Sequence, residues 1–479
     1  MEGWMRMSSL LLLAVSLCGS FCWAGPSADL ITSLPGQPNV LFAQYAGYID
    51  VDASAGRSFF YYLAEAEDAS SKPLTLWLNG GPGCSSVGNG GFTENGPFRV
   101  CSASGQLKEN QFAWNTVSNM LYLDSPAGVG WSYTNTSGYI VANDTLTAQD
   151  NFIFLQNWFE AFPEYKGREF FITGESYAGH YVPQLASLIV DYMTQNGTSV
   201  VNLVGLAIGN PLLDGLVDFP ERNFFLWSHA VISDSTYRSI MENCNYSVLS
   251  VPNDACVSAS MDYDREVSGY IDEYDILIDV CLAPNMQQAQ RLRLKQSPLR
   301  LKTLHKQLRD SPSPLDVCMD DEVLAYMNIP AVQQAFHANI TGLPYRWSYC
   351  NEGSLLYDES GLDDSMLPTL SHILEHGVSV LVYSGDEDSV IPFGGTRRLV
   401  DQLAKMNGLE TSVPYSPWLD GGQVGGWTQV YGRLSYATVR GGGHMVPFTS
   451  PGRALTLFKS FLAGGPLPSL SSRSEVQRA

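Results

Sequence analysis

Short apolar runs alternate with longer segments of helical periodicity along most of the chain. The helical segments carry apolar residues three or four positions apart, as in residues 145–162, where Phe152, Leu155 and Phe159 share one face. A second such segment follows Ser176. This alternation predicts an α/β fold in which helices flank a central, mostly parallel, twisted sheet. The runs that predict strands are residues 74–78, 120–123, 169–173, 200–208, 378–383 and 434–439.

The first 24 residues form a unit of their own. One basic residue, Arg6, precedes an apolar run over residues 10–21, and a small residue, Ala24, ends the segment. This order is typical of a secretory signal peptide. A membrane anchor would need about 20 continuous apolar residues, whereas Gly19 and Ser20 interrupt this run. We therefore expect residues 1–24 to be removed, and no later stretch of the sequence is long enough to span a bilayer.

The alternation of strands and helices fades between residues 220 and 345. We interpret this stretch as a largely helical cap inserted between two parts of the core, residues 25–219 and 346–464. Within it, residues 291–309 hold seven Lys and Arg residues and no acidic residue. Such a run is either a solvated basic helix face or an exposed linker, near residues 287–315, that proteases excise. The Ser-rich residues 465–479 predict a flexible tail.

Charge and composition exclude several classes of protein. Acidic residues outnumber basic residues by 48 to 27, so the formal net charge is −21. Nucleic acids and anionic membranes are polyanions that bind Lys and Arg surfaces, and we exclude both as partners. Hydrophobic residues make up 45% of the chain, which excludes disorder as its overall state.

The cysteines and sequons agree with a secretory route. In an oxidising compartment the cysteines that follow the signal peptide are expected to form up to three disulfides and to leave one thiol, with a pairing that their spacing does not set. No C-x-x-C pair supports a zinc site. The cysteines are Cys84, Cys101, Cys244, Cys256, Cys281, Cys318 and Cys350. The candidate glycosylation sites are Asn135, Asn143, Asn196, Asn245 and Asn339.

A candidate nucleophile lies in the sequence Gly174-Glu175-Ser176-Tyr177-Ala178-Gly179, between a predicted strand and a predicted helix. A serine on such a sharp turn projects its hydroxyl above the sheet, and the following N–H faces a developing oxyanion. The strict pattern is G-x-S-x-G, and Ala178 occupies the second small position here. The alternative is an ordinary tight turn between a strand and a helix.

A base and an acid follow in the order typical of α/β-hydrolases, Ser, Asp, His. His444 lies in a loop after the strand predicted at residues 434–439, directly behind three glycines that leave room for an imidazole. Asp386 and Asp388 both follow the strand predicted at residues 378–383, and the pattern does not choose between them. His180 is a rival base, but its place in the helix after Ser176 favours packing.

A second motif indicates a different chemistry. Residues 372–376 read H-x-x-E-H, the inverted pattern of zinc proteases. However, Gly377 ends this helix at once, and histidine near a helix C-terminus is favoured by the helix dipole. No distinctive third ligand follows, so we predict neither a metal nor another cofactor.

The motifs together resemble the serine carboxypeptidase family, and closely its plant members. The resemblance extends from about residue 35 to residue 463. It implies Ser176 as nucleophile, His444 as general base and Asp388, rather than Asp386, as the acid that orients the imidazole. The stretches that carry it are residues 77–86 (WLNGGPGCSS), 92–97 (FTENGP), 174–179, 384–392 and 442–447.

The resemblance also implies a binding site. It assigns the oxyanion hole to Gly81 and Tyr177, and it places Asn79, Gly80, Glu94 and Glu175 around the terminal carboxylate of the substrate. Two acids should repel an anion, but in a dry pocket the pKa of at least one rises, and a shared proton can then be donated to the carboxylate. Activity at acidic pH is the consequence.

Further expectations come from the same resemblance. It implies the disulfides Cys84–Cys350, Cys244–Cys256 and Cys281–Cys318, with Cys101 free. The expected activity is release of single C-terminal residues from peptides through an acyl-enzyme, in an extracellular, vacuolar or lysosomal compartment. A homodimer is left open. An acyltransferase or a hydroxynitrile lyase on the same scaffold is the alternative activity, and a catalytically silent binding protein is the alternative class.

Overall fold

The computed structural model describes residues 26–101, 105–136, 140–197, 201–281, 315–351 and 355–469. The predicted signal peptide, the basic run at residues 291–309 and most of the predicted tail lie outside these ranges. No helix within them is long and apolar enough to cross a membrane.

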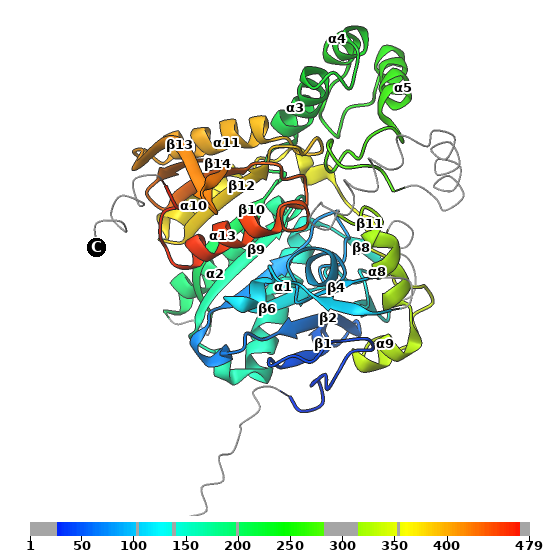
Figure 1. Ribbon diagram of the computed structural model, residues 1–479, viewed down its shortest axis with the longest axis vertical. Coiled ribbons are helices and arrows are strands. Elements are labelled where there is room, and N and C mark those ends of the chain that lie inside the picture. Colours follow the sequence, from blue (N-terminus) through cyan, green and yellow to red (C-terminus); the bar gives the residue numbers. More distant parts are fainter. Residues whose placement is uncertain are drawn as a thin grey trace, which may run out of the picture.

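A single large sheet organises the molecule (Figure 1). Its strands lie in the order β1-β2-β6-β3-β9-β10-β12-β15-β14-β13, and β7 (Tyr133–Thr134) pairs with β2. The six central strands are parallel: β6 (Asn119–Leu123), β3 (Leu74–Leu78), β9 (Glu169–Glu175), β10 (Asn202–Gly209), β12 (Ser379–Gly385) and β15 (Leu434–Val439). The edges are antiparallel: β1 (Gln44–Asp52) and β2 (Arg57–Ala64) on one side, β14 (Gln423–Tyr431) and β13 (Val413–Asp420) on the other.

Side chains at alternate positions of the strands belong to two separate hydrophobic cores. In β12, Val380 and Val382 belong to one core cluster, while Leu381 and Tyr383 belong to the other. Successive side chains of a strand point to opposite faces, so a strand that is apolar throughout must be covered on both sides. The structure thereby confirms the predicted α/β-hydrolase class with a mostly parallel, helix-flanked sheet.

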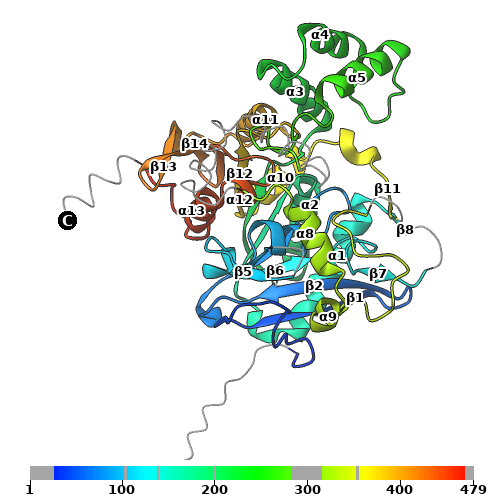
Figure 2. The same cartoon turned by 45° about the vertical axis from the view of Figure 1, so that its right-hand side comes forward.

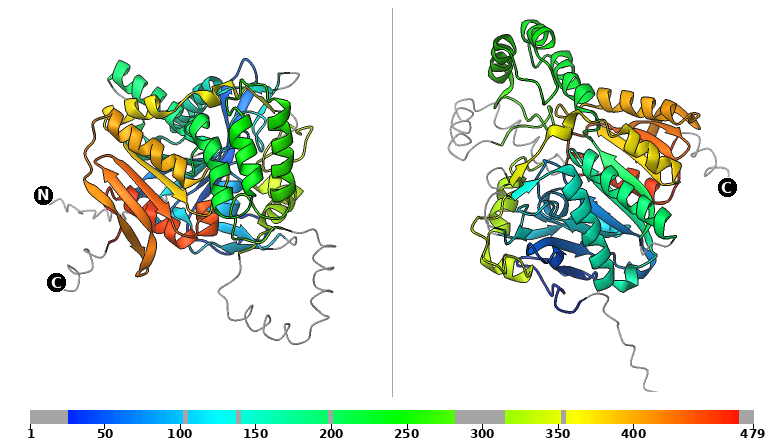
Figure 3. Two further views of the ribbon diagram at one scale, coloured as in Figure 1. Left: turned by 90° about the horizontal axis from the view of Figure 1, so that it is seen from above. Right: turned by 180° about the vertical axis from the view of Figure 1, so that it is seen from behind.

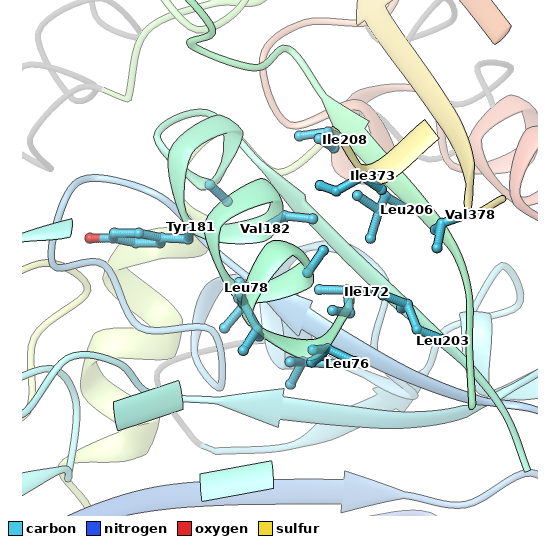
Figure 4. Close-up of a cluster of buried hydrophobic side chains, with 14 of the residues drawn as sticks. Leu76, Leu78, Ile172, Tyr181, Val182, Leu203, Leu206, Ile208, Ile373 and Val378 are labelled. Carbon is cyan, nitrogen blue, oxygen red and sulfur yellow. The ribbon is translucent and has the colours of Figure 1, made fainter. Parts of the chain in front are cut away.

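Helices cover both faces. The first core receives side chains from α1 (Asp144–Ala161), α2 (Ala178–Asn196), α10 (Leu367–Glu375) and α11 (Phe393–Met406). Figure 4 shows part of it, where Val182 of α2 lies close to Leu78 and Ile172 of the sheet. The second core receives side chains from α8 (Met319–Met327), α9 (Pro330–Ala335), α12 (Val446–Thr449) and α13 (Pro451–Leu462).

The segment predicted as one cap divides into two parts. The helices α3 (Gly215–Ser228), α4 (Asp234–Asn243) and α5 (Asp254–Val267) project beyond the sheet, as Figures 1 and 3 show. By contrast, α8 and α9 lie against the β1–β2 half of the molecule (Figure 2) and bury Val323, Tyr326 and Val332 in the second core. The predicted boundary between residues 219 and 220 falls inside α3, because one continuous helix leads from the core into the projection.

The remaining described elements are short. They are β4 (Phe98–Val100), β5 (Leu107–Glu109), β8 (Ile140–Ala142), β11 (Leu355–Tyr357), η1 (Ala69–Ser71), η3 (Trp114–Thr116), η4 (Pro163–Tyr165) and η5 (Ser360–Asp363). One turn of π-helix, η2 (Asn89–Glu94), is fully buried.

Among the described residues, three disulfides join Cys84 to Cys350, Cys244 to Cys256 and Cys281 to Cys318, which is the pairing that the resemblance implies. Cys101 is free. Four sequon asparagines, Asn135, Asn143, Asn196 and Asn245, are exposed. Asn339 is half-buried, and its side-chain amide donates to Gln333 at 3.1 Å.

Candidate active site

Ser176 occupies a sharp turn between β9 and α2. Its φ is +62°, in the left-handed region that non-glycine residues rarely adopt, and such strain costs about 1–3 kcal/mol and persists only where the surroundings hold it. The Ser176 N–H donates to Gly209 O at 3.1 Å, and its carbonyl accepts from Gly179 N at 2.9 Å and Leu212 N at 3.0 Å. The backbone of the turn is therefore fixed by neighbouring segments.

The small residues of the motif are required by close packing. A Cβ on Gly174 would lie 2.5 Å from Leu78 O, and one on Gly179 would lie 2.2 Å from Leu212 O. Ala178, by contrast, keeps its methyl group in a fully buried position. The turn therefore needs glycine at 174 and 179 but accepts alanine at 178.

The imidazole of His444 lies against Asp388. Its Nδ1 is 2.8 Å from Asp388 Oδ2, and the side chains are 2% and 0% exposed, respectively. Asp386, which the sequence pattern left as an alternative, accepts instead from the Gly441 N–H at 2.6 Å. Because an ionised carboxylate only accepts hydrogen bonds, Nδ1 carries the proton and Nε2 is left as the acceptor.

Asn210 holds Asp388 in place, and no sequence motif identified it. Its Nδ2 donates to Asp388 Oδ2 at 2.7 Å, and its Oδ1 accepts from Gly385 N at 3.1 Å. The N–H groups of Val390 and Ile391 also donate to Asp388, at 2.7 and 3.2 Å. The carboxylate is thus fixed by donors on two neighbouring loops.

The segment after α5 fixes His444 from the other side. The His444 N–H donates to Tyr274 O at 2.5 Å, and the two rings meet edge to face with centroids 5.1 Å apart. A Cβ on Gly443 would lie 2.5 Å from Tyr274 O, which explains the glycine before the histidine. Within the described residues, the buried His444 Nε2 has no hydrogen-bond partner and is available to a substrate or nucleophile.

The Gly-rich loop after β3 runs against the turn that carries Ser176. A Cβ on Gly80 would lie 2.3 Å from Tyr177 N and 2.9 Å from Ser176 Cβ. Gly81, the next residue, has a φ of +112°, a conformation that favours glycine. The structure therefore brings the loop with the predicted donor Gly81 directly beside the backbone of Tyr177.

Asn79, Glu94 and Glu175 form one buried cluster. The Asn79 Nδ2 donates to Glu94 Oε1 at 2.8 Å and to Glu175 Oε1 at 3.0 Å. Its Oδ1 accepts from Trp77 Nε1 at 2.7 Å and Gly90 N at 3.0 Å, which fixes the orientation of the amide. The three side chains are at most 4% exposed, so neither carboxyl is solvated.

The protonation of the two carboxyls follows from this setting. Burial raises the pKa of Glu94. Burial and the neighbouring Glu94 carboxyl together raise the pKa of Glu175 well above its ordinary value. Two adjacent buried carboxyls cannot both ionise without strong repulsion, so they retain a proton between them. Arg99 donates to the Glu94 carbonyl oxygen, and burial lowers the pKa of Arg99 to about 10.

The rival residues have other partners. His180 is fully buried, and its Nδ1 lies 2.9 Å from Asp144 Oδ2. In the H-x-x-E-H segment, His372 contacts Asp191 at 2.9 Å and His376 Nδ1 contacts the His372 carbonyl at 2.8 Å. No group of three or more potential metal ligands occurs among the described residues.

Comparison with known proteins identifies the family of this chain. Residues 35–464 match the family model described as serine carboxypeptidase. The chain belongs to the serine carboxypeptidase family. It is 47% identical over 468 residues to serine carboxypeptidase-like 46 of Arabidopsis thaliana, covering 96% of both chains. It is 44% identical to serine carboxypeptidase 24 of the same plant, covering 97% of this chain and 99% of that protein.

A solved structure shows the same fold. The prohormone-processing carboxypeptidase Kex1(delta)p from Saccharomyces cerevisiae aligns with a TM-score of 0.69 at 20% identity, over 92% of this chain and 95% of that one. Membership of the family makes the protein a serine-type hydrolase.

Proposed function

We propose that this enzyme releases single C-terminal residues from peptides, at acidic pH, through an acyl-enzyme. The observation that carries the proposal is the buried Glu94–Asn79–Glu175 cluster, whose member Glu175 directly precedes Ser176. An enzyme that recognises the C-terminal carboxylate and cleaves the peptide bond next to it needs its carboxylate-binding site to lie beside its nucleophile.

The cluster suits a carboxylate because it can donate hydrogen bonds to one. Two ionised glutamates would repel the substrate, whereas a proton held between them supplies an O–H donor beside the amide of Asn79. As pH rises through the raised pKa of Glu175, that proton is lost and the substrate carboxylate is repelled. Binding of substrate should therefore be strongest in acid.

The chemistry assigned to the remaining residues is acyl transfer. Ser176 Oγ attacks the last peptide carbonyl while His444 Nε2 accepts its proton, and Asp388 stabilises the imidazolium that forms. The N–H groups of Gly81 and Tyr177 stabilise the oxyanion. His444 then returns the proton to the departing amino acid, and water attacks the acyl-enzyme by the same steps.

The compartment inferred for this activity is acidic and oxidising, such as a vacuole or lysosome or an acidic extracellular space. The predicted signal peptide, three disulfides and four exposed sequon asparagines support a secretory route.

The decisive experiment is an assay of blocked dipeptides with a free C-terminal carboxylate, run beside a glucose ester as acyl donor. Release of the free C-terminal amino acid, abolished in Ser176→Ala, is the expected result. Acyl transfer from the glucose ester without peptide hydrolysis would establish the alternative, an acyltransferase. Absence of both activities, together with failure of an organophosphate to label Ser176, would make the protein a silent binding protein.

A further inference from the structure

Asp144 accepts four side-chain hydrogen bonds at the start of α1. Its Oδ1 accepts from the hydroxyls of Tyr177 at 3.0 Å and Tyr357 at 2.7 Å. Its Oδ2 accepts from His180 Nδ1 and Gln184 Nε2, both at 2.9 Å. The carboxylate thus connects α1 to β11 and to both the turn and the first helical turns that follow the nucleophile.

One of these partners, Tyr177, directly follows Ser176. Its ring stacks on His180 with centroids 5.1 Å apart and planes inclined by 21°. Tyr181 and Tyr357 meet it edge to face, at 5.2 and 5.6 Å. The ring is therefore packed on several sides, and Asp144 holds the hydroxyl at its far end.

The peptide bond between Ser176 and Tyr177 is the part of the turn whose position matters for the proposed oxyanion hole. The peptide between Ser176 and Tyr177 carries the Tyr177 N–H, and its orientation depends on the left-handed backbone of Ser176. A shift of the turn that displaces the Tyr177 Cα would have to carry the Tyr177 side chain with it. A ring that is packed on several sides and bound at its hydroxyl opposes that shift and so holds the Cα from which the Tyr177 N–H extends.

We propose that Asp144 is a positioning residue for the oxyanion hole, acting through the Tyr177 hydroxyl on the Tyr177 N–H. This rests on the proposed role of that N–H in catalysis. An ionised carboxylate can accept all four hydrogen bonds, whereas a neutral Asn or Asp at this position cannot. Burial by itself raises the pKa of Asp144, but hydrogen bonds from His180, Tyr357 and Gln184 outweigh it, so the pKa lies below its ordinary value.

The test uses Asp144→Asn, Tyr177→Phe and the double variant. Asp144→Asn keeps the Asn143 sequon intact, since Asn143 and Thr145 are unchanged. The matched control is Asp150→Asn, on the same helix, which removes a buried carboxylate from its ion pair with Arg57 at 2.8 Å. Each variant is assayed for kcat and KM on a blocked dipeptide and for the rate at which diisopropyl fluorophosphate inactivates it, which does not depend on the substrate class.

We expect Asp144→Asn and Tyr177→Phe each to lower kcat and the inactivation rate by about tenfold or more, with KM within about twofold, because small displacements of catalytic groups cost this much. The double variant should lose no more than the single ones, since both act through one hydrogen bond. Asp150→Asn should keep both rates.

Independent, multiplicative losses in the double variant, or equal losses in Asp150→Asn, would overturn the proposal. If Asp144→Asn fails to fold, an unchanged kcat in Tyr177→Phe would overturn it equally. These outcomes are separate from failure of the proposed function, which would show as absent peptide hydrolysis in the wild type while diisopropyl fluorophosphate still inactivates it.

Discussion

Two acidic sites lie on either side of the nucleophile along the chain. Before Ser176, Glu175 shares the two amide hydrogens of Asn79 with Glu94. After Ser176, Tyr177 binds Asp144, a single carboxylate that accepts four side-chain hydrogen bonds. The pKa of Glu175 is raised and that of Asp144 is lowered. Burial raises the pKa of both carboxyls, but the adjacent Glu94 raises that of Glu175 further, whereas hydrogen bonds from His180, Tyr357 and Gln184 outweigh burial at Asp144.

The largest loss of stability is expected for Asn79→Leu, because the Asn79 amide donates to both Glu94 and Glu175. The substitution removes this donor from both buried carboxyls and should lower the free energy of unfolding at pH 7 by about 3–5 kcal/mol. The loss should be smaller at pH 4.5, where a protonated pair can bind each other. Urea unfolding at both pH values measures it.

The control for that variant is Asn110→Leu, which removes a buried amide that donates to Gly96 O at 2.9 Å. Its loss should be the same at both pH values. An equally pH-independent loss in Asn79→Leu would contradict the description of the cluster as a proton-sharing pair.

Asp144→Asn should lower the free energy of unfolding by a smaller amount, about 2 kcal/mol at pH 7, because charge-assisted hydrogen bonds are lost. A lowered pKa in the folded state contributes stability above the ordinary pKa, and this stability is lost as pH falls through the folded pKa. The cost of the substitution should therefore shrink in acid. Thermal unfolding across pH 3–7 checks this, and a cost that grows in acid would be the contrary result.

The smallest effect, with the opposite sign, is expected for Glu175→Gln. The folded state keeps a proton that the unfolded chain releases above the ordinary pKa, so the wild type loses stability as pH rises. The substitution should stabilise the protein by about 1 kcal/mol at pH 7 and do little in acid.

In kinetic assays of Glu175→Gln, the rise of KM should move to higher pH, whereas the exposed Glu109→Gln should keep the wild-type profile. An unchanged pH profile of KM in Glu175→Gln would contradict the role assigned to the proton shared by Glu94 and Glu175.

Much of the fold was readable from local patterns. The strands β3 and β15 have their predicted bounds, and α1 begins and ends within one residue of residues 145–162. The antiparallel edge strands β1, β2, β13 and β14 were not predicted. Many residues of β13 and β14 are partly or fully exposed, and such strands do not carry the continuous apolar runs of a buried parallel strand. That reason does not apply to β1 and β2, which are mostly buried.

The residues of the candidate site likewise divide into those that carry a sequence signal and those that carry none. Ser176, His444 and the loop with Gly81 follow strands and carry their own glycine signals. Asn210 carries no such signal, since its contact with Asp388 arises only because β10 lies beside β12 in the sheet. The contact of Asp144 with Tyr177 likewise depends on the packing of α1 against α2. Such partners are set by tertiary arrangement, which a local motif does not encode.

The central claim is that a proton held by Glu94 and Glu175 recognises the substrate carboxylate. The most direct measurement compares kcat/KM for a blocked dipeptide and for its C-terminal amide across the pH range 4–8. The account predicts that preference for the free carboxylate is greatest in acid, falls as pH rises in the wild type, and persists to higher pH in Glu175→Gln. A preference that stays constant with pH in the wild type would contradict it.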